Sequence, residues 1–156
     1  MKVSDILRVK GGTLFTVTPE QQLADAVDAM AENDIGSLVV MDHGELVGVL
    51  TFREVILAIV RNGGSVGNTL IRAVMDDAPL TCTPETELDE VRRMMLGRHA
   101  RYTPVMSQQM LMGVISFYDV AKAVVDSQDF ENRMLKAYIR DWPVEEADGE
   151  QQTSSS

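Results

Sequence analysis

Two short motifs, each a hydroxyl residue followed three positions later by an acid, are the part of this sequence best suited to chemistry. Ser116 precedes Asp119, and Thr51 precedes Glu54. A hydroxyl and a carboxylate at this spacing form a capping box at the start of a helix. The same helix start favours an anionic ligand, because unpaired backbone N–H groups and the helix dipole point at it. The motifs therefore allow capping and binding, and one residue can do both.

No group of residues has the pattern of a catalytic centre. The sequence lacks a Gly-x-Ser-x-Gly elbow, a phosphate-binding loop ending in Gly-Lys-Ser/Thr, and a convincing Cys–His pair. His43 and His99 have no cysteine or carboxylate at metal-ligand spacing, so we expect both to face solvent. Cys82 lies in an alternating apolar stretch and predicts a buried, inert thiol. We expect a protein that is not an enzyme, holds no metal ion and requires no cofactor.

Charge and hydropathy narrow the classes of partner. The 156 residues include 24 acidic and 14 basic side chains, a formal net charge of -10. This balance argues against binding duplex nucleic acid. No apolar run approaches the roughly 20 residues of a membrane span, and the first residues show no signal-peptide core. These features predict a cytoplasmic protein without membrane contact, and residues 143–156 predict an acidic, disordered tail.

An internal repeat organises the chain. Shifting the sequence by 65 residues aligns 16–55 with 81–120 without a gap, and 13 of the 40 pairs are identical. The pairs Pro19/Pro84 and Gly48/Gly113 are among them. A shorter match at another shift aligns residues 3–7 with residues 71–75. The sequence therefore predicts four parts, which are a first repeat (1–66), a second repeat (67–126), a C-terminal helix (127–142) and the acidic tail (143–156).

Each repeat predicts a strand, a helix, two strands and a closing helix. The first helices are expected to begin at Pro19 and Pro84, since proline suits a first helical turn. The strands of the first copy are expected at 37–41 and 45–51, joined by a turn at 42–44. The closing helices carry apolar residues at matching positions: Val55, Ile56, Ile59 and Val60 in one, Val120, Ala121, Val124 and Val125 in the other.

A small sheet with helices on one side cannot close a core by itself. The predicted fold is therefore α/β (α+β), with the two repeats packed sheet to sheet under pseudo-two-fold symmetry and a related cleft at each side. The C-terminal helix adds an apolar stripe of Phe130, Met134, Ala137 and Tyr138. That stripe either packs on its own module or forms a dimer contact.

The segments that carry the repeat resemble the cystathionine-β-synthase (CBS) domain family. The family pattern is glycine, two apolar residues, Ser or Thr, two variable residues and Asp. Residues 113–119 fit it fully, and residues 48–54 depart at the end, where Glu54 replaces Asp. Residues 101–105 are similar to the family's strand before the turn. The resemblance spans residues 1–126, and with Lys10-Gly11 the chain looks like the small stand-alone bacterial CBS-pair proteins.

This resemblance implies an adenine nucleotide as ligand: AMP, ADP or ATP, with NAD(H) or S-adenosylmethionine in some members. Asp119 would hold the ribose hydroxyls, Ser116 or Thr51 a phosphate, and Arg101 a phosphate in some members. Lys10 and Arg101 also have plain readings as surface side chains. The main cleft would comprise Ile35, Gly36, Ser37, Val114, Ser116, Tyr118, Asp119, Arg101 and Lys10.

A second cleft follows from the internal symmetry. It would comprise Val49, Thr51, Arg53, Glu54, Ala100 and Tyr102. Glu54 is one methylene longer than aspartate, so its carboxylate would overreach a ribose placed as in the main cleft. We expect the second cleft to be weaker, altered or empty, and Glu54 with Thr51 equally suits a helix cap.

Three functions compete at this point. The first is a nucleotide-sensing regulatory module that relays energy or redox state to an unidentified protein partner. The second is an interaction module whose clefts are vestigial. The third, a regulatory fragment of a metabolic enzyme such as inosine-monophosphate dehydrogenase, is weak because no barrel segment flanks the repeats. A homodimer is expected from the resemblance.

Overall fold

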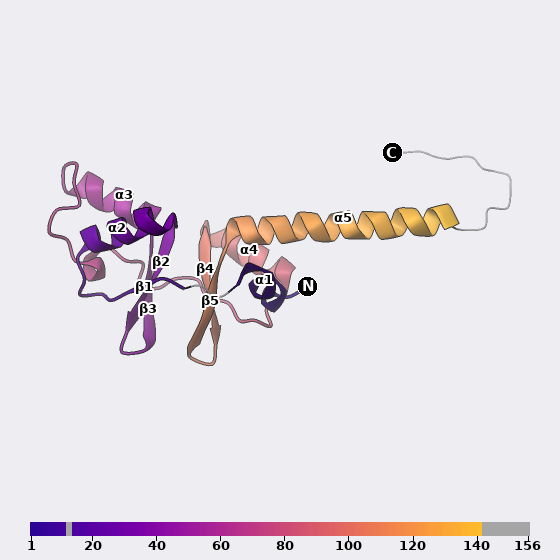
Figure 1. The fold of residues 1–156 in the computed structure, drawn as a ribbon, viewed down its shortest axis with the longest axis horizontal. Helices are drawn as coiled ribbons and strands as arrows, with labels where there is room; N and C mark the ends of the chain where they lie inside the picture. The colour runs from indigo at the N-terminus through magenta and orange to yellow at the C-terminus, as the bar shows by residue number, and fades with distance from the viewer. Residues whose placement is uncertain (12–13, 142–156) are drawn as a thin grey trace. The chain divides into compact units, whose positions relative to one another are not determined.

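The computed structural model describes residues 1–11 and 14–141, without the side chains of residues 129, 130 and 141. The acidic tail expected at 143–156 lies outside the described residues, as does the side chain of Phe130 in the C-terminal stripe. Residues 1–122 form one compact unit that contains both repeats, and residues from 123 onward belong to a second unit. Figure 1 labels the elements.

The two repeats have the same order of elements. In the first, a three-stranded sheet is formed by β1 (Thr16–Val17), β2 (Ser37–Asp42) and β3 (Glu45–Thr51), with helices α2 (Leu23–Asn33) and α3 (Phe52–Arg61). In the second, β4 (Tyr102–Ser107) pairs with β5 (Met110–Ser116), with helices α4 (Leu88–Arg98) and α5 (Phe117–Asp141). Two short helices, α1 (Val3–Lys10) and the 3-10 turn η1 (Ile71–Ala73), precede the repeats.

Local irregularities repeat with the same register, which confirms the predicted symmetry. Each hairpin is antiparallel and shifts register at one place, between Val40 and Met41 or between Val105 and Met106. The short strand before each helix runs parallel to the hairpin, as β1 beside β2 and as the bridge of Cys82 to Val105. The two hairpins stand next to each other in Figure 1. The fold is thus the predicted pair of sheet-to-sheet repeats.

The proline positions differ from expectation. Helices α2 and α4 begin at Leu23 and Leu88, several residues after Pro19 and Pro84. Each proline instead occupies a turn closed by a backbone hydrogen bond, in which Gln21 N donates to Thr18 O at 3.2 Å and Thr86 N to Thr83 O at 3.1 Å. Proline suits the second position of such a turn because its φ is already set.

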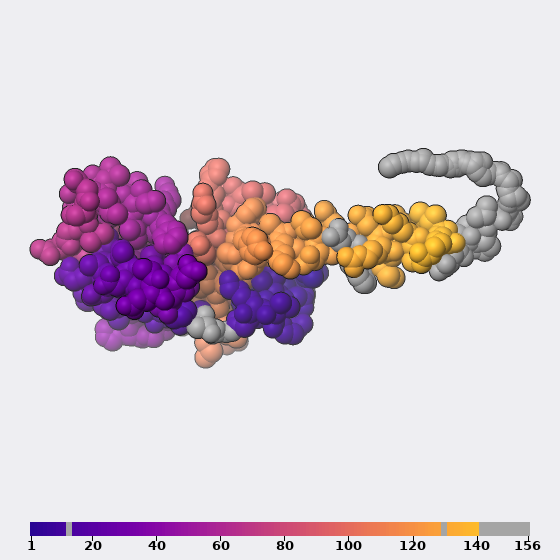
Figure 2. All heavy atoms as spheres, turned by 45° about the horizontal axis from the view of Figure 1, so that its top comes forward, coloured from indigo at the N-terminus to yellow at the C-terminus, as the bar shows by residue number. Residues whose placement is uncertain are grey.

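The leading segments are exchanged between the repeats. Helix α1 continues onto the second repeat, where Val3 N donates to Thr86 O at 2.9 Å and Leu88 N donates to Met1 O at 2.8 Å. The segment around η1 does the same for the first repeat, where Leu23 N donates to Thr69 O at 2.7 Å. Figure 2 shows the indigo N-terminal segment against the second repeat. The boundary predicted at residue 66 therefore separates the two repeats in the sequence. It does not separate the two halves as they pack, because each half includes the leading segment of the other repeat.

Two identical glycines admit these exchanged segments to the sheets. A Cβ atom on Gly113 would lie 2.8 Å from Leu7 Cδ2, and one on Gly48 would lie 2.8 Å from both Met75 Sδ and the Asp76 carbonyl oxygen. Leu7 and Met75 are matching positions of the short leading repeat. Glycine occupies both sites because any side chain would displace the segment that closes the core.

The first repeat closes its core with both of its helices. Leu23, Leu38, Leu50 and Ile71 are fully buried, so strands, α2 and the η1 segment all contribute. Helix α3 buries Val55 and Ala58. Ile56 and Val60, expected with the apolar face, are instead exposed. Cys82 is buried as predicted, and burial raises the pKa of its thiol to about 12.

Helix α5 runs without a break from Phe117 to Asp141, so the closing helix and the C-terminal helix expected from the sequence are one element. No glycine or proline interrupts residues 117–141, which explains the continuity. Met134 and Tyr138 of the C-terminal stripe are exposed. No helix among the described residues is long and apolar enough to cross a membrane.

We expect Gly48→Ala to lower the free energy of unfolding by about 1–3 kcal/mol, because the new methyl group meets a backbone carbonyl as well as Met75. Gly97→Ala is the matched control. Gly97 lies in α4 with open space around it, so alanine should stabilise the protein by about 0.5–1 kcal/mol. Urea unfolding measures both, and equal effects would contradict the close packing at Gly48.

Candidate functional site

A pocket of about 330 Å³ lies between the two repeats and is called the first pocket below. Its volume is within the range of small-molecule sites, roughly 300–1,000 Å³. Seven of the nine residues expected in the main cleft line it: Lys10, Ile35, Gly36, Ser37, Val114, Ser116 and Tyr118. Leu14, Phe15, Val39, Tyr102 and two glycines, Gly11 and Gly113, complete the lining.

Elements from both repeats position these side chains. Ile35, Gly36 and Ser37 lead into β2, while Val114 and Ser116 are on β5 and Tyr118 is in the first turn of α5. Lys10 is the last residue of α1, which packs on the second repeat. The first pocket therefore has an apolar wall from one repeat and a polar end at a helix start of the other.

Asp119 lies behind the polar end of the first pocket and is not among its lining residues. Its Oδ2 accepts from Ser116 N at 2.8 Å and from Lys10 Nζ at 2.6 Å, while Asp119 N donates to Ser116 Oγ at 3.0 Å. The predicted capping box is thus formed. Lys10, which does line the pocket, joins Asp119 to it.

Opposing effects set the pKa of Asp119. Partial burial alone would raise it, but the hydrogen bonds from Lys10 and Ser116 and the Lys10 charge outweigh burial and lower the pKa below its ordinary value. The side chain of Asp119 is 19% exposed, and that of Lys10 is 40% exposed. The carboxylate is therefore ionised at neutral pH and pre-oriented at the pocket's edge.

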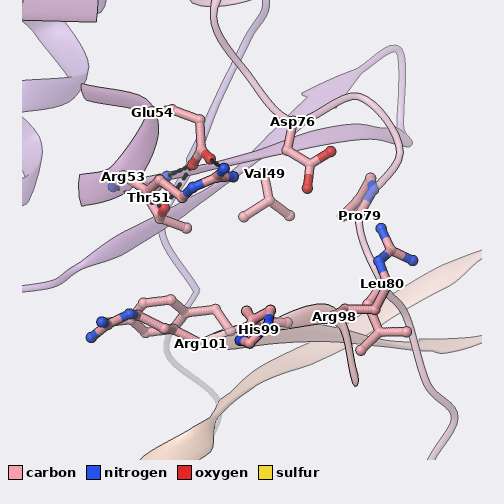
Figure 3. Close-up of a pocket in the computed structure, with 12 residues that line it drawn as sticks. Val49, Thr51, Arg53, Glu54, Asp76, Pro79, Leu80, Arg98, His99 and Arg101 are labelled. Carbon is pink, nitrogen blue, oxygen red and sulfur yellow. Dashed lines mark hydrogen bonds and ion pairs between the residues drawn. The ribbon is translucent and has the colours of Figure 1, made fainter. Parts of the chain in front are cut away.

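A second pocket, of about 100 Å³, lies between the repeats at the symmetry-related position. All six residues expected in the second cleft line it: Val49, Thr51, Arg53, Glu54, Ala100 and Tyr102. Asp76, Pro79, Leu80, Arg98, His99 and Arg101 complete the lining. Figure 3 shows Arg53 and Glu54 on one wall, with His99 and Arg101 on the facing wall.

Glu54 is occupied by its own helix. Its Oε1 accepts from Thr51 N at 2.7 Å and from Thr51 Oγ1 at 2.6 Å, which makes the capping box at the start of α3. The residue is 9% exposed. The predicted helix cap is therefore present, as it is at Asp119 in the other repeat.

Arg101 is placed differently from the prediction, which put it in the main cleft. It lines the second pocket and not the first. The reason is the repeat itself, because Arg101 matches Gly36 in the aligned copies and so belongs to the opposite pocket.

Tyr102, expected only in the second cleft, lines both pockets. A Cβ on Gly36 would lie 2.3 Å from its Oη, so this ring crosses from the second repeat to the first. Tyr102 therefore forms a wall that the two pockets share. Arg98 and His99 were not predicted, and the repeat gave no signal for them, because their counterparts Asn33 and Asp34 do not line the first pocket.

Elsewhere the described residues offer weaker sites. A larger, more open hollow of about 1100 Å³ lies at the hairpin turns and is lined by Met41, Gln108, Gln109 and Met110 among others, without a charged side chain. The described residues contain no group of three or more histidine, cysteine, aspartate or glutamate side chains placed to hold a metal ion.

The fold and its paired pockets define a tandem α/β repeat module with clefts between the repeats. Comparison with known families identifies this module, since the CBS domain family model matches residues 3–61 and 71–126. The chain belongs to the CBS domain family and contains a tandem pair of these domains.

Relatives and solved structures agree with this assignment. The mitochondrial CBS domain-containing protein CBSX3 of Arabidopsis thaliana is 31% identical over 147 residues, which cover 88% of this chain and 71% of the relative. A putative signal-transduction protein with CBS domains from Burkholderia ambifaria is 30% identical, with a TM-score of 0.76, covering 82% of this chain and 96% of that one. The CBS pair of protein MJ0100, solved with 5'-methylthioadenosine and S-adenosyl-L-methionine, is 21% identical with a TM-score of 0.72, covering 81% and 98%.

We predict that Asp119→Ala destabilises the protein by about 1 kcal/mol at neutral pH, through loss of the cap. Because the folded pKa is lowered, this contribution is complete above the ordinary aspartate pKa and is lost as the pH falls through the folded value. Urea unfolding at decreasing pH should show the difference in free energy of unfolding between wild type and Asp119→Ala becoming smaller. Glu32→Ala, at an exposed site near the end of α2, is the control, and a pH-independent gap for Asp119→Ala would contradict the assignment.

Proposed function

We propose that this CBS pair is a non-catalytic regulatory module that binds an adenine nucleotide in the first pocket. The ligand is AMP, ADP or ATP, with NAD(H) as the alternative. The observation that carries the proposal is the composition of the first pocket, where apolar walls at Ile35, Val39 and Val114 lead to a polar end at Ser116 and Lys10. A purine needs such walls, and a ribose phosphate needs such an end.

The polar end offers complementary groups. A carboxylate can accept hydrogen bonds from both ribose hydroxyls, and Asp119 is held ionised at the edge of the pocket. The ammonium group of Lys10, which lines the pocket, donates to Asp119. As the ligand enters, this group would donate to a phosphate oxygen in place of Asp119.

Binding would act on both repeats together. The first pocket takes residues from β2 and β5 and from α1, so a bound nucleotide would contact both repeats at once. A ligand shifts the population of states by no more than its difference in affinity between them. The proposed readout is the module's contact with a second copy or with another protein, which carries the energy or redox signal onward.

At 21% identity, the similarity to MJ0100 concerns the fold alone. That protein holds adenosine derivatives, and the proposal for this chain is consistent with a ligand of that class. Its support comes from the pocket residues named above. The cytoplasmic location remains a prediction from the sequence.

Isothermal titration calorimetry with adenosine, AMP, ATP and NADH tests the site. Wild-type protein should bind at least one of them, and Asp119→Asn should weaken binding about tenfold or more, because hydrogen bonds to a charged group contribute about 1.5–3 kcal/mol. Glu32→Gln, which neutralises an exposed carboxylate away from the pockets, should bind like wild type.

No heat with any of the four ligands would refute the nucleotide site, as would equal affinity in Asp119→Asn. Such a result would favour the alternative function, a protein-interaction or dimerisation module with vestigial clefts. Its structural support is that Glu54 and Asp119 both already serve as helix caps.

We also propose a homodimer. Helix α3 presents Phe52, Ile56 and Val60 at four-residue spacing, with exposed fractions of 54%, 58% and 71%. Residues at this spacing share one helix face, and an exposed apolar stripe of this kind marks an interaction surface. A second copy of the chain is the partner that the family resemblance implies.

Light scattering at micromolar concentration should therefore give the mass of a dimer, and Ile56→Asp should give the mass of a monomer without loss of helical circular dichroism. The charged side chain would have to be buried unpaired at the interface. Arg61→Ala, in the last turn of the same helix, should leave the dimer intact. A monomeric wild-type protein would contradict the proposal.

A further inference from the structure

The second pocket differs from the first in its charged side chains as well as in size, because three arginines and two carboxylates line it, whereas Lys10 is the one charged residue that lines the first. Aligning the repeats places Arg98, Arg101 and Arg53 where the other copy has Asn33, Gly36 and Tyr118. Three positions that carry no positive charge around the first pocket are therefore arginines around the second. All three arginines line it, in a chain whose net charge is -10.

The same replacements change the space available. Where the first pocket has Gly36 and Ser37, the second has the larger matching residues Arg101 and Tyr102. The result is a volume of about 100 Å³ against 330 Å³. The second pocket is below the roughly 300 Å³ lower limit of sites that enclose drug-sized ligands.

The acidic groups of the second pocket are already engaged with the protein. Glu54 Oε1 accepts two hydrogen bonds from Thr51, and Asp76 Oδ1 accepts one from Ala78 N at 3.1 Å. The two carboxylates keep their charge, so the three arginines leave the lining with a formal charge of +1 (three positive and two negative groups). The closest approach is 4.0 Å, between Arg53 Nη1 and Glu54 Oε2.

The arginines, in contrast, keep donors to spare. A guanidinium has five N–H donors, and Arg98 uses Nη2 to reach Ala78 O at 3.0 Å. Among the described residues, no carboxylate lies within ion-pair distance of Arg101. Figure 3 shows Arg98 and Arg101 reaching toward opposite ends of the pocket, with Arg53 on the other wall. Donors placed in this way suit an anion with several oxygens spread along its length.

We infer that the second pocket is a phosphoryl-anion site, which takes a short polyphosphate such as pyrophosphate and not a nucleoside. Arginine forks match phosphate oxygens in pairs, which gives both attraction and orientation. The start of α3, whose first turn contains Arg53, adds its dipole to the same field. This inference goes beyond the proposed nucleotide site, because it concerns the other pocket and needs no purine.

Calorimetric titration with sodium pyrophosphate tests it, using variants that restore the residues of the other repeat. Arg101→Gly and Arg53→Tyr copy Gly36 and Tyr118, so the fold already tolerates these residues at matching positions. Each should weaken pyrophosphate binding about tenfold or more. Arg61→Ala removes a cation from the same helix, outside the pocket, and should leave the affinity unchanged.

Competition separates this site from the nucleotide site. Saturating adenosine, which carries no phosphate, should not displace pyrophosphate, because Tyr102 stands between the two pockets. Displacement by ADP but not by adenosine would show that the phosphoryl group belongs to a nucleotide, while displacement by neither would show a free inorganic anion. Both outcomes support the site, and pyrophosphate binding without any binding of adenosine, AMP, ATP or NADH would refute only the proposed function.

Three results would overturn the inference. They are no binding of pyrophosphate to the wild-type protein, equal binding by Arg101→Gly and Arg53→Tyr, and displacement of pyrophosphate by adenosine. Circular dichroism of each variant confirms that it is folded before binding is compared.

Discussion

The exchange of leading segments is the constraint on which this structure depends. Neither repeat completes its own core, because α1 closes the second repeat and the η1 segment closes the first. Each exchange is held by backbone hydrogen bonds to the start of the helix it caps, at Leu23 and at Leu88. The identical glycines Gly48 and Gly113 leave the space that these segments occupy. The two halves must therefore fold against each other, and their seam places both pockets.

Symmetry in the backbone and asymmetry in the side chains together explain the pockets. The hairpins, their bulges and the helix starts repeat closely, so two clefts of related shape are unavoidable. The residues that differ between the copies then decide what each cleft can hold. The first pocket is the larger and has the Asp119 carboxylate at its edge, while the second is small and lined by three arginines and two carboxylates. A duplicated fold has in this way produced two chemically distinct sites.

The residues that cap two helices are also those to which the proposal assigns ligand binding. Asp119 and Glu54 each satisfy backbone donors at a helix start, and these donors are otherwise unpaired. Asp119 also accepts from Lys10, whose helix belongs to the exchanged N-terminal segment. A ligand that competes for Lys10 would thus act on the segment that closes the second repeat. The polar end of the first pocket is coupled to the packing of the whole module.

Much of this architecture could be predicted from the sequence, because repeats and alternating patterns are visible in the order of the residues alone. The 65-residue shift predicted the two copies, the hairpin limits and the pairing of Gly48 with Gly113, and it predicted six of the residues that line the second pocket. The capping boxes followed from the spacing of Thr51 and Glu54 and of Ser116 and Asp119. The capping boxes depend on residues three positions apart, and the repeat is visible because the two copies keep the same residue types at a fixed shift.

Other features were decided only by the tertiary structure. The sequence matched residues 3–7 to residues 71–75, but only packing shows that each segment belongs to the opposite repeat. Arg101 was expected in the main cleft but lines the second pocket, because the spacing of residues along one element does not say what lies across from it. The volumes of the two pockets depend on side chains brought together from both repeats. Those contacts arise from the free energy of packing distant segments, which no local pattern records.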